Sequence, residues 1–303
     1  MTEPTTALGR IETFVADNAR ALDVARFRHH LLGDSVDSVI AELARFQNED
    51  GGFGHGLESD LRLPDSSPIC TWVGLTQLVE LGVDGESDLV QRALAYLTVT
   101  YQARTHGWPP VGAAVNDHPH GAWWDFDVEK GGTFFLDTPW NPTAALVGFM
   151  WHYGNPGPPS RTHQTDRAIT YLRDRSDTDI EWHELNTLIQ LASHAPEPQR
   201  QELQTLTAAA VDRVVERDPE EWSGYGPQPL NFVSGPEHYL YAGLREHVEA
   251  NLDDWMETLQ EDGAWVLSYK WQRDEEAFER LRPEITASFA IHRAIILRAF
   301  GRL

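Results

Sequence analysis

The sequence predicts an all-helical protein, and more closely an α/α toroid of about five to six helical hairpins. Three observations support this prediction. Apolar residues recur at helical spacing along most of the chain. A unit of helix, glycine-rich loop and helix recurs in fixed order, which is typical of stacked or closed arrays of helical hairpins. No segment shows the alternating β-branched pattern of a strand.

The clearest copy of this unit spans residues 44–75. A helix is expected to end near Gln47, because the four glycines that follow are costly in a regular helix. The run Asp65-Ser66-Ser67-Pro68 then restarts a helix, with a hydroxyl or carboxylate as cap and Pro68 in the first turn. Phe53 is expected to act as an aromatic plug within the loop.

Weaker copies follow at three places. The segment Leu259-Gln260-Glu261-Asp262-Gly263-Ala264-Trp265 repeats the order of Gln, acid, Asp-Gly and aromatic. Two further glycine-aromatic loops, at residues 131–135 and 222–226, also lead to expected helix starts. The expected starts of the inner helices carry polar side chains at Asp65, Asp137, Asn141, Glu237, His238 and Glu284.

The remaining helices follow from apolar spacing. They are expected at residues 8–32 (with possible breaks), 36–46, 68–81, 87–101, 140–153, 165–173, 180–194, 198–217, 237–244, 245–259 and 284–300. Residues 68–81 are apolar on most sides, which indicates a helix surrounded by protein. Residues 102–139 form a long irregular insert of the kind that is usually functional or mobile. A single domain over residues 1–303 is expected, because the repeats continue across the Pro/Gly connector at 154–160.

Composition narrows the classes of partner. Lys and Arg number 24 against 47 Asp and Glu, which gives a formal net charge of −23. Such a surface repels nucleic acid and anionic lipid, so neither is an expected partner, and the charge by itself implies no function. A small-molecule ligand is expected instead from the aromatic and polar residues described below. The single cysteine, Cys70, excludes an internal disulfide and favours a reducing compartment. No secretion signal or apolar stretch of membrane-spanning length is present, so a cytoplasmic location is expected.

A family resemblance rests on the two clearest repeats. The motifs Gln47-x-x-Asp50-Gly51-Gly52-Phe53-Gly54 and Gln260-x-Asp262-Gly263-Ala264-Trp265 resemble the Gln-Trp repeats of terpenoid cyclases and the glycine repeats of protein prenyltransferase β subunits. The resemblance implies an α/α toroid with a central cavity. The second copy is one residue tighter between Gln and Asp.

The catalytic motifs of those families are not matched. The Asp-x-Asp-Asp motif of squalene-type cyclases is missing, since Asn251 stands where the first Asp would precede Asp253-Asp254. The Asp-Asp-x-x-Asp magnesium motif is also missing. The zinc motif Asp-x-Cys does not carry over, because Pro68 stands two residues before Cys70. The resemblance therefore implies a fold and a pocket, but no catalytic residue and no cofactor.

Candidate acid or base residues lie between the glycine loop and the Pro68 helix, with a further one in the insert. The candidate catalytic carboxylates are Asp65, Glu58, Asp60 and Asp137. An apolar wall such as Trp72 would raise the pKa of a nearby carboxyl group and suit it to general acid catalysis. The alternative is that Asp65 caps a helix and that Arg62 pairs with Glu58 or Asp60.

Candidate binding residues combine polar groups with aromatic rings. They are His55, Trp72, Trp108, Asn116, Asp117, His118, His120, Trp123, Trp124, Trp140, Asn141, Glu237 and His238. His118 and His120, flanked by Asp117, could bind a divalent metal, but no close pair of further ligands supports such a site. The alternative is a solvent-facing loop whose histidines only form hydrogen bonds.

Three functions are compatible with these patterns, and the first is preferred. The first is a terpenoid-cyclase-like or prenyltransferase-like protein that binds or transforms an apolar, isoprenoid-like molecule in an aromatic-lined cavity. The second is a carbohydrate-active toroid with paired carboxylates. The third is a non-catalytic scaffold, since fold does not fix function. An open cleft with two carboxylates would favour the second, and whether the protein is an enzyme stays open at this stage.

Overall fold

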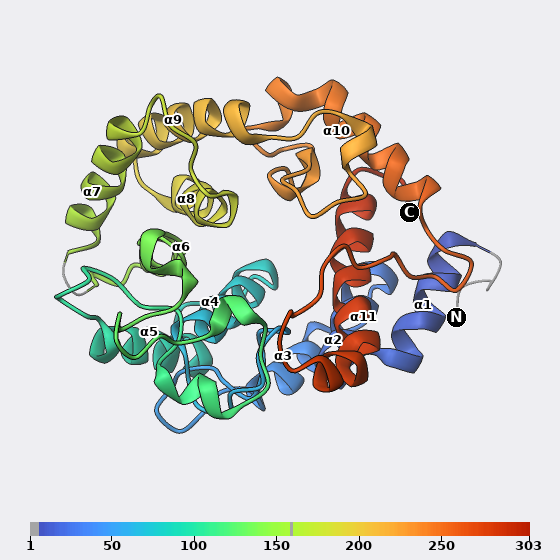
Figure 1. The fold of residues 1–303 in the computed structure, drawn as a ribbon, viewed down its shortest axis with the longest axis horizontal. Helices are drawn as coiled ribbons and strands as arrows, with labels where there is room; N and C mark the ends of the chain where they lie inside the picture. The colour runs from blue at the N-terminus through green and yellow to red at the C-terminus, as the bar shows by residue number, and fades with distance from the viewer. Residues whose placement is uncertain (1–5, 158–159) are drawn as a thin grey trace. The chain divides into compact units, whose positions relative to one another are not determined.

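The structure is a computed structural model that describes residues 6–157 and 160–303. Within these residues it contains eleven α-helices and no β-strand, which confirms the all-α prediction (Figure 1). The chain divides into two compact units. The first unit comprises residues 1–43 and 215–303, and the second comprises residues 44–214.

The first unit is built around a long C-terminal helix. Its α-helices are α1 (Ala7–Asn18), α2 (Ala21–Phe27), α3 (Val36–Ala44, which runs to the boundary), α10 (Tyr241–Glu257) and α11 (Glu275–Ala299). A π-helical turn, η1 (Arg28–Leu32), continues α2, and the 3-10 turns η5 (Pro219–Glu221) and η6 (Pro229–Asn231) precede α10. Helices α1 and α2 pack against α11 and bury its apolar face, including Ile285 and Ile291.

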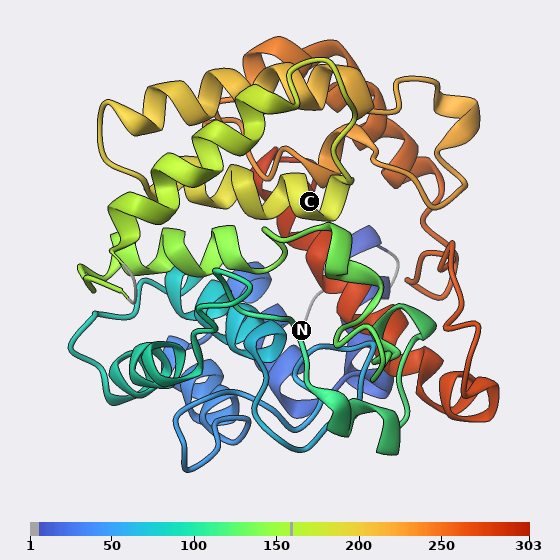
Figure 2. The same ribbon diagram turned by 60° about the vertical axis from the view of Figure 1, so that its left-hand side comes forward.

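The second unit holds the remaining helices and the long insert. Its α-helices are α4 (Pro68–Glu80), α5 (Asp88–Thr100), α6 (Thr143–His152), α7 (Arg161–Asp174), α8 (Trp182–His194) and α9 (Gln199–Val214). Helix α8 lies between α6 and α9 and packs against both (Figures 1 and 2). The insert carries three 3-10 turns, η2 (Ala113–Asp117), η3 (Ala122–Trp124) and η4 (Phe134–Asp137). Irregular structure over residues 102–139 was expected from composition and is confirmed.

The glycine loop folds as a tight turn with the expected aromatic plug. Phe53 is 0% exposed, and its ring lies against Gly74 of α4, where a Cβ atom would come within 2.7 Å of the ring. Ser67 caps α4 by accepting a hydrogen bond from the backbone of Cys70, and Pro68 occupies the first turn. The cap is therefore a hydroxyl, as one of the two predicted alternatives has it, and Asp65 is not the cap.

Two expected helix starts are wrong. Glu284 lies inside α11, which begins nine residues earlier and contains Pro283 in its interior. A proline removes only its own N–H and its ring clash can be relieved by a local bend, so it does not always mark a start. Glu237 lies in a turn, and α10 runs unbroken from Tyr241 through the predicted boundary at residue 245.

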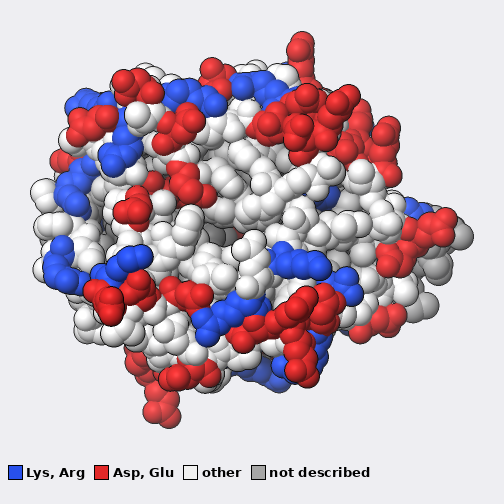
Figure 3. Space-filling model, viewed as in Figure 1, with Lys and Arg blue, Asp and Glu red and all other residues white. Residues whose placement is uncertain are grey.

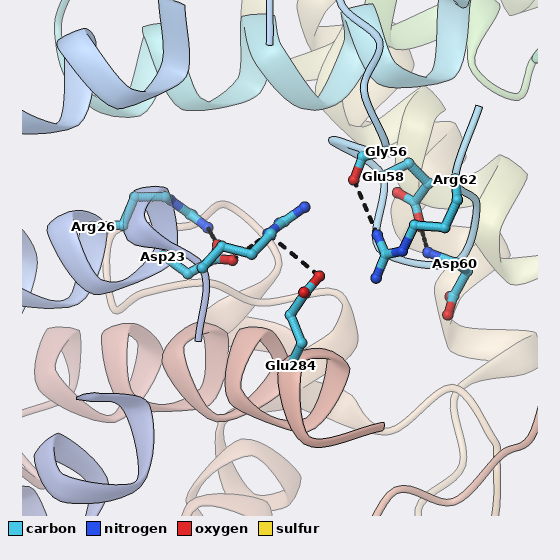
Figure 4. A network of polar contacts seen from close by, with 8 residues as sticks. Asp23, Arg26, Gly56, Glu58, Asp60, Arg62 and Glu284 are labelled. Carbon is cyan, nitrogen blue, oxygen red and sulfur yellow. Dashed lines mark hydrogen bonds and ion pairs between the residues drawn. The ribbon is translucent and has the colours of Figure 1, made fainter. Parts of the chain in front are cut away.

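Charged side chains cover the surface of the molecule, and a few form ion pairs within the fold. Asp and Glu side chains spread over the face drawn in Figure 3, with Lys and Arg between them, as the net charge of −23 requires. In the first unit, the buried Asp23 accepts a hydrogen bond from Arg20 Nε at 2.6 Å, and Arg20 also pairs with Glu284 at 3.8 Å (Figure 4).

None of the helices in the described residues has the length and apolar content needed to cross a membrane.

Candidate active site

A pocket of about 540 Å³ lies within the second unit, between the insert, the end of α7 and the start of α8. Its wall combines carboxyl groups, hydroxyl groups, two cations and an apolar side. The lining residues are Asp125, Asp127, Lys130, Gly132, Thr133, Phe134, Leu136, Asp137, Thr138, Tyr171, Arg175, Asp179, Ile180, Glu181 and Glu184. A concave site with a few convergent polar groups is the usual form of a small-molecule site.

Glu184 is the buried acid of this pocket. Glu184 is 1% exposed, although it lies in the first turn of α8, near the end of the helix. The backbone N–H of Trp140 donates to Oε1 at 2.9 Å, and the hydroxyl of Tyr171 donates to Oε2 at 2.5 Å. Desolvation by burial outweighs these hydrogen bonds and raises the pKa of Glu184 to about 7. Glu184 therefore holds its proton to a higher pH than an ordinary glutamate does.

Tyr171 connects Glu184 to the pocket. Burial, followed by the neighbouring charge of Glu184, raises the pKa of Tyr171, so its hydroxyl stays protonated wherever Glu184 titrates. When Glu184 is ionised, the tyrosine hydroxyl donates to it. When Glu184 is neutral, its own proton can be donated to the tyrosine oxygen, which leaves the hydroxyl hydrogen free to point elsewhere. The pair thus holds one exchangeable proton at the wall of the pocket.

Glu181 is the ionised partner. It caps α8 by accepting from the backbone N–H of Glu184 at 3.0 Å, and it binds Nδ1 of His183 at 2.5 Å. Burial alone would raise the pKa of Glu181, but the hydrogen bonds and charge of His183 and the helix backbone together lower it below its usual value. Two carboxyl groups three residues apart therefore have pKa values displaced in opposite directions.

The loop before α6 is held against this pair by a threonine. Thr187, one turn after Glu184, lies 2.8 Å from the carbonyl oxygen of Trp140, to which its hydroxyl can donate. Helix α8 therefore faces both backbone groups of Trp140: the carboxyl group of Glu184 accepts from its N–H, and the hydroxyl of Thr187 lies within hydrogen-bond distance of its carbonyl oxygen as well as that of Glu184. This arrangement fixes the N–H that stabilises the ionised form of Glu184.

Of the predicted catalytic carboxylates, only Asp137 lines the pocket. Asp65 is exposed and does not line it. Glu58 and Asp60 are half-buried in the loop after the glycine turn, where Oε1 of Glu58 accepts from the backbone N–H of Asp60 at 3.4 Å (Figure 4). Arg62, in the same loop, donates to the carbonyl oxygen of Gly56.

The predicted histidines fall in three different settings. His55 is exposed, and His118 is half-buried. His120 is 0% exposed, with Nδ1 2.6 Å from the carbonyl oxygen of His118 and Nε2 3.0 Å from Oδ1 of Asp125, which lines the pocket. Both ring nitrogens therefore face oxygen atoms within the insert. Among the described residues, no group of three or more His, Cys, Asp or Glu side chains is placed to hold a metal ion.

The predicted tryptophans are mostly buried. Trp108 is 2% exposed and donates from Nε1 to Leu97, so it anchors the insert to α5. Trp72 donates to Gln190 and Trp123 is half-buried. Trp124 packs against Phe135, and Trp140 contacts Glu184 through its backbone. None of these five side chains lines the pocket.

The other predicted polar residues have local roles. Asn116 exchanges two hydrogen bonds with the backbone of Phe126 and so closes the insert on itself. Asp117 is exposed and Asn141 is buried. Glu237 and His238 lie in the first unit, and burial lowers the pKa of His238 to about 4. The segment around residues 60–62 does pair with residues 119–121 of the insert, through the Leu61–His120 bridge.

The central residues of the pocket were not among the sequence candidates. Tyr171, Arg175, Glu181 and Glu184 lie in or beside helices whose patterns indicated only packing. One signal was available, because Glu184 stands four residues before Leu188 and so falls on the apolar face of α8. A carboxyl group is rarely fully buried in a protein unless it is paired with another group. Neither a protein-family model nor a curated protein matches the sequence.

Proposed function

We propose that this protein is a carbohydrate-active enzyme that cleaves a glycosidic bond by acid–base catalysis in the pocket of the second unit. One observation carries the proposal: the pocket holds two carboxyl groups whose pKa values are displaced in opposite directions, that of Glu184 to about 7 and that of Glu181 downward. Such a pair suits one group to give a proton and the other to accept one.

In the proposed reaction, Glu184 gives a proton to the glycosidic oxygen through the hydroxyl of Tyr171 as the carbon–oxygen bond breaks. A water molecule adds to the sugar carbon, and Glu181 accepts the proton that this water releases. The Trp140 N–H then stabilises the carboxylate that Glu184 has become. Proton count balances, since one proton leaves Glu184 and one arrives at Glu181.

A second candidate keeps the first sequence hypothesis, an apolar and isoprenoid-like ligand. The observation in its favour is that Phe134 and Leu136 line the pocket while 68% and 43% exposed. The six carboxyl groups of the same wall favour a polar substrate. The resemblance to terpenoid cyclases and the α/α toroid stay proposals, supported by the recurrence of the same glycine turn in both units.

The test is a screen of aryl glycosides and polysaccharides, followed by variants assayed on whichever substrate is cleaved. Glu184→Gln and Glu181→Gln should each lower kcat by about 100-fold or more. Tyr171→Phe should also slow the reaction. Glu202→Gln is the matched control, because Glu202 is a half-buried carboxylate of the same unit that pairs with Arg173 outside the pocket.

Two outcomes would overturn the proposal. One is that no glycoside in the screen is cleaved. The other is that Glu184→Gln cleaves as fast as the parent. Thermal stabilisation by farnesol, with no effect of sugars, would favour the apolar-ligand candidate.

A further inference from the structure

The side chain of Arg175 is the feature of the pocket that the proposed reaction leaves unused. Arg175 follows α7 directly, is half-buried and lines the pocket. Its guanidinium carbon lies over the ring of Tyr171, 3.9 Å from the ring centroid, which is a cation–π contact. Its backbone oxygen accepts a hydrogen bond from Arg213 of α9 at 3.2 Å. The guanidinium thus has a contact on Tyr171, and the backbone of Arg175 has one on α9.

This guanidinium has no acceptor among the residues that the structure describes. It forms no hydrogen bond and no ion pair with any side chain or backbone oxygen in residues 6–157 and 160–303. Lys130, the other cation of the wall, is paired with Asp127 at 3.4 Å. Arg175 therefore presents donors in a planar fork that matches a carboxylate and that no protein group uses.

The acidic wall does not exclude an anion at this position. Three of the acidic side chains already have partners: Asp125 with His120, Asp127 with Lys130, and Glu181 with His183. The two that lack a partner among the described residues, Asp137 and Asp179, are exposed, and solvent screens their charge. Glu184, the carboxyl group nearest to the Tyr171 hydroxyl, carries no charge when protonated.

We propose that Arg175 binds the carboxylate of the substrate, and hence that the substrate is an acidic sugar with a uronic acid residue beside the bond to be cleaved. This inference rests on the proposed function for the sugar and on the geometry of Arg175 for the carboxylate. The contact with Tyr171 brings the proposed carboxylate site next to the proposed proton donor, because the ring under the guanidinium carries the hydroxyl that bonds to Glu184. A carboxylate bound by Arg175 therefore lies close to the proton donor.

The experiment measures the affinity of D-glucuronate and of D-glucose by isothermal titration calorimetry at pH 5. At this pH Glu184 is protonated with or without Arg175, so its titration does not confuse the comparison. The parent should bind glucuronate about tenfold or more tightly than glucose, as expected for a charge-assisted, two-point contact. Arg175→Gln should remove this preference and leave glucose binding unchanged, and Arg175→Lys should restore only part of it.

Arg173→Gln is the matched control. It removes the same charge from α7, two residues away, but Arg173 is exposed, pairs with Glu202 and does not line the pocket. This variant should keep the full preference for glucuronate. A parent without any preference, or a preference that survives in Arg175→Gln, would overturn the inference.

Failure of the inference and failure of the proposed function give different results. If neutral glycosides are cleaved and Arg175→Gln does not change selectivity, the function stands and the role of Arg175 is wrong. If glucuronate binds through Arg175 but no glycoside is cleaved, the carboxylate site stands and the catalytic function is wrong.

Discussion

The two glycine turns, one in each unit, share a backbone but differ in their surroundings. In the second unit, Asn48 N–H donates to Gly52 O at 2.9 Å and Gly51 N–H donates to Asn48 O at 3.0 Å. In the first unit, Gln260 and Ala264 form the same bond at 2.9 Å, and Gly263 donates to Gln260 at 3.1 Å. The acid before each glycine accepts one backbone N–H at 3.0 Å in both copies.

This equivalence explains the spacing difference in the sequence. Gln260 occupies the place of Asn48, and not that of Gln47, so the shorter distance from Gln to Asp reflects a different residue in the same role. Gln47 has its own function, donating to the carbonyl oxygens of Gly51 and Leu89. The backbone of the turn, rather than its glutamine, is what the two units have in common.

The surroundings of the turns differ at one position above all. A Cβ atom at Gly52 would come within 2.5 Å of the Cβ of Ser66, which the second unit places against the turn. The first unit has Ala264 at the corresponding position. The turn that leads to the pocket-bearing helices is therefore packed more closely at this position. It is also tied to the next helix start, because Ser66 forms hydrogen bonds with Asn48 and Asp50.

Truncation of the two plugs should have the largest effect and tests whether they are equivalent. Phe53 is 0% exposed and Trp265 is 2% exposed, so Phe53→Ala and Trp265→Ala should each cost about 3 to 5 kcal/mol of unfolding free energy. Denaturant titration measures this loss. Tyr225→Ala is the control, because Tyr225 is 55% exposed and should change stability by less than about 0.5 kcal/mol. An unchanged midpoint for either plug variant would show that the turn is not anchored by it.

Alanine at the shared glycine should be the next largest effect and should be similar in the two units. Gly51 and Gly263 both have φ near +89°, and a Cβ would come within 2.3 Å of Arg92 O in one copy and 2.2 Å of Arg10 O in the other. Left-handed strain and overpacking together should cost about 2 to 5 kcal/mol in each variant. Hydrogen exchange would locate the loss in the corresponding unit, and a loss in only one of them would break the equivalence.

The units should also differ in their response to pH, because only the second contains Glu184. Its folded-state pKa of about 7 lies above the ordinary value of 4.5, so the folded state binds the proton more tightly. Stability from this group is present below pH 4.5 and is lost as pH rises to about 7, by up to about 3 kcal/mol. The charged and titratable groups that act on Glu184 are Tyr171 in α7, Arg175 directly after α7, and Glu181 at the N-cap of α8.

Glu184→Gln isolates this term, because a glutamine amide can accept from Trp140 N–H and donate to Tyr171 as neutral Glu184 does. The difference in unfolding free energy between the variant and the parent should grow from pH 5 to pH 8. His194, in the same unit, has a pKa lowered to about 4 and acts with the opposite sign, but it is common to both proteins and cancels. A difference that stays constant with pH would show that Glu184 does not titrate in this range.

The helices and the plug were predictable from sequence because they depend on local spacing. The apolar face of residues 180–194 and the Ser67-Pro68 start need only neighbours along the chain. The candidate site was not predictable in the same way. The pKa of Glu184 is raised by burial, and the groups that meet its carboxyl group, the Trp140 N–H and the Tyr171 hydroxyl, come from 44 and 13 residues away in the sequence. Asp65 illustrates the reverse error, since its motif was suggestive but the fold leaves it exposed.

The smallest expected effect concerns the acid of the turn, and it tests whether the closer packing of the second unit has an energetic counterpart. Asp50 accepts the N–H of Gly52 and also the hydroxyl of Ser66 at 2.6 Å, whereas Asp262 accepts only the backbone bond among its contacts in the described residues. Asp50→Ala should therefore cost about 1 kcal/mol more than Asp262→Ala, the usual net value of one hydrogen bond. A double-mutant cycle with Ser66→Ala assigns the difference: a coupling energy near zero would mean that this contact does not distinguish the turns.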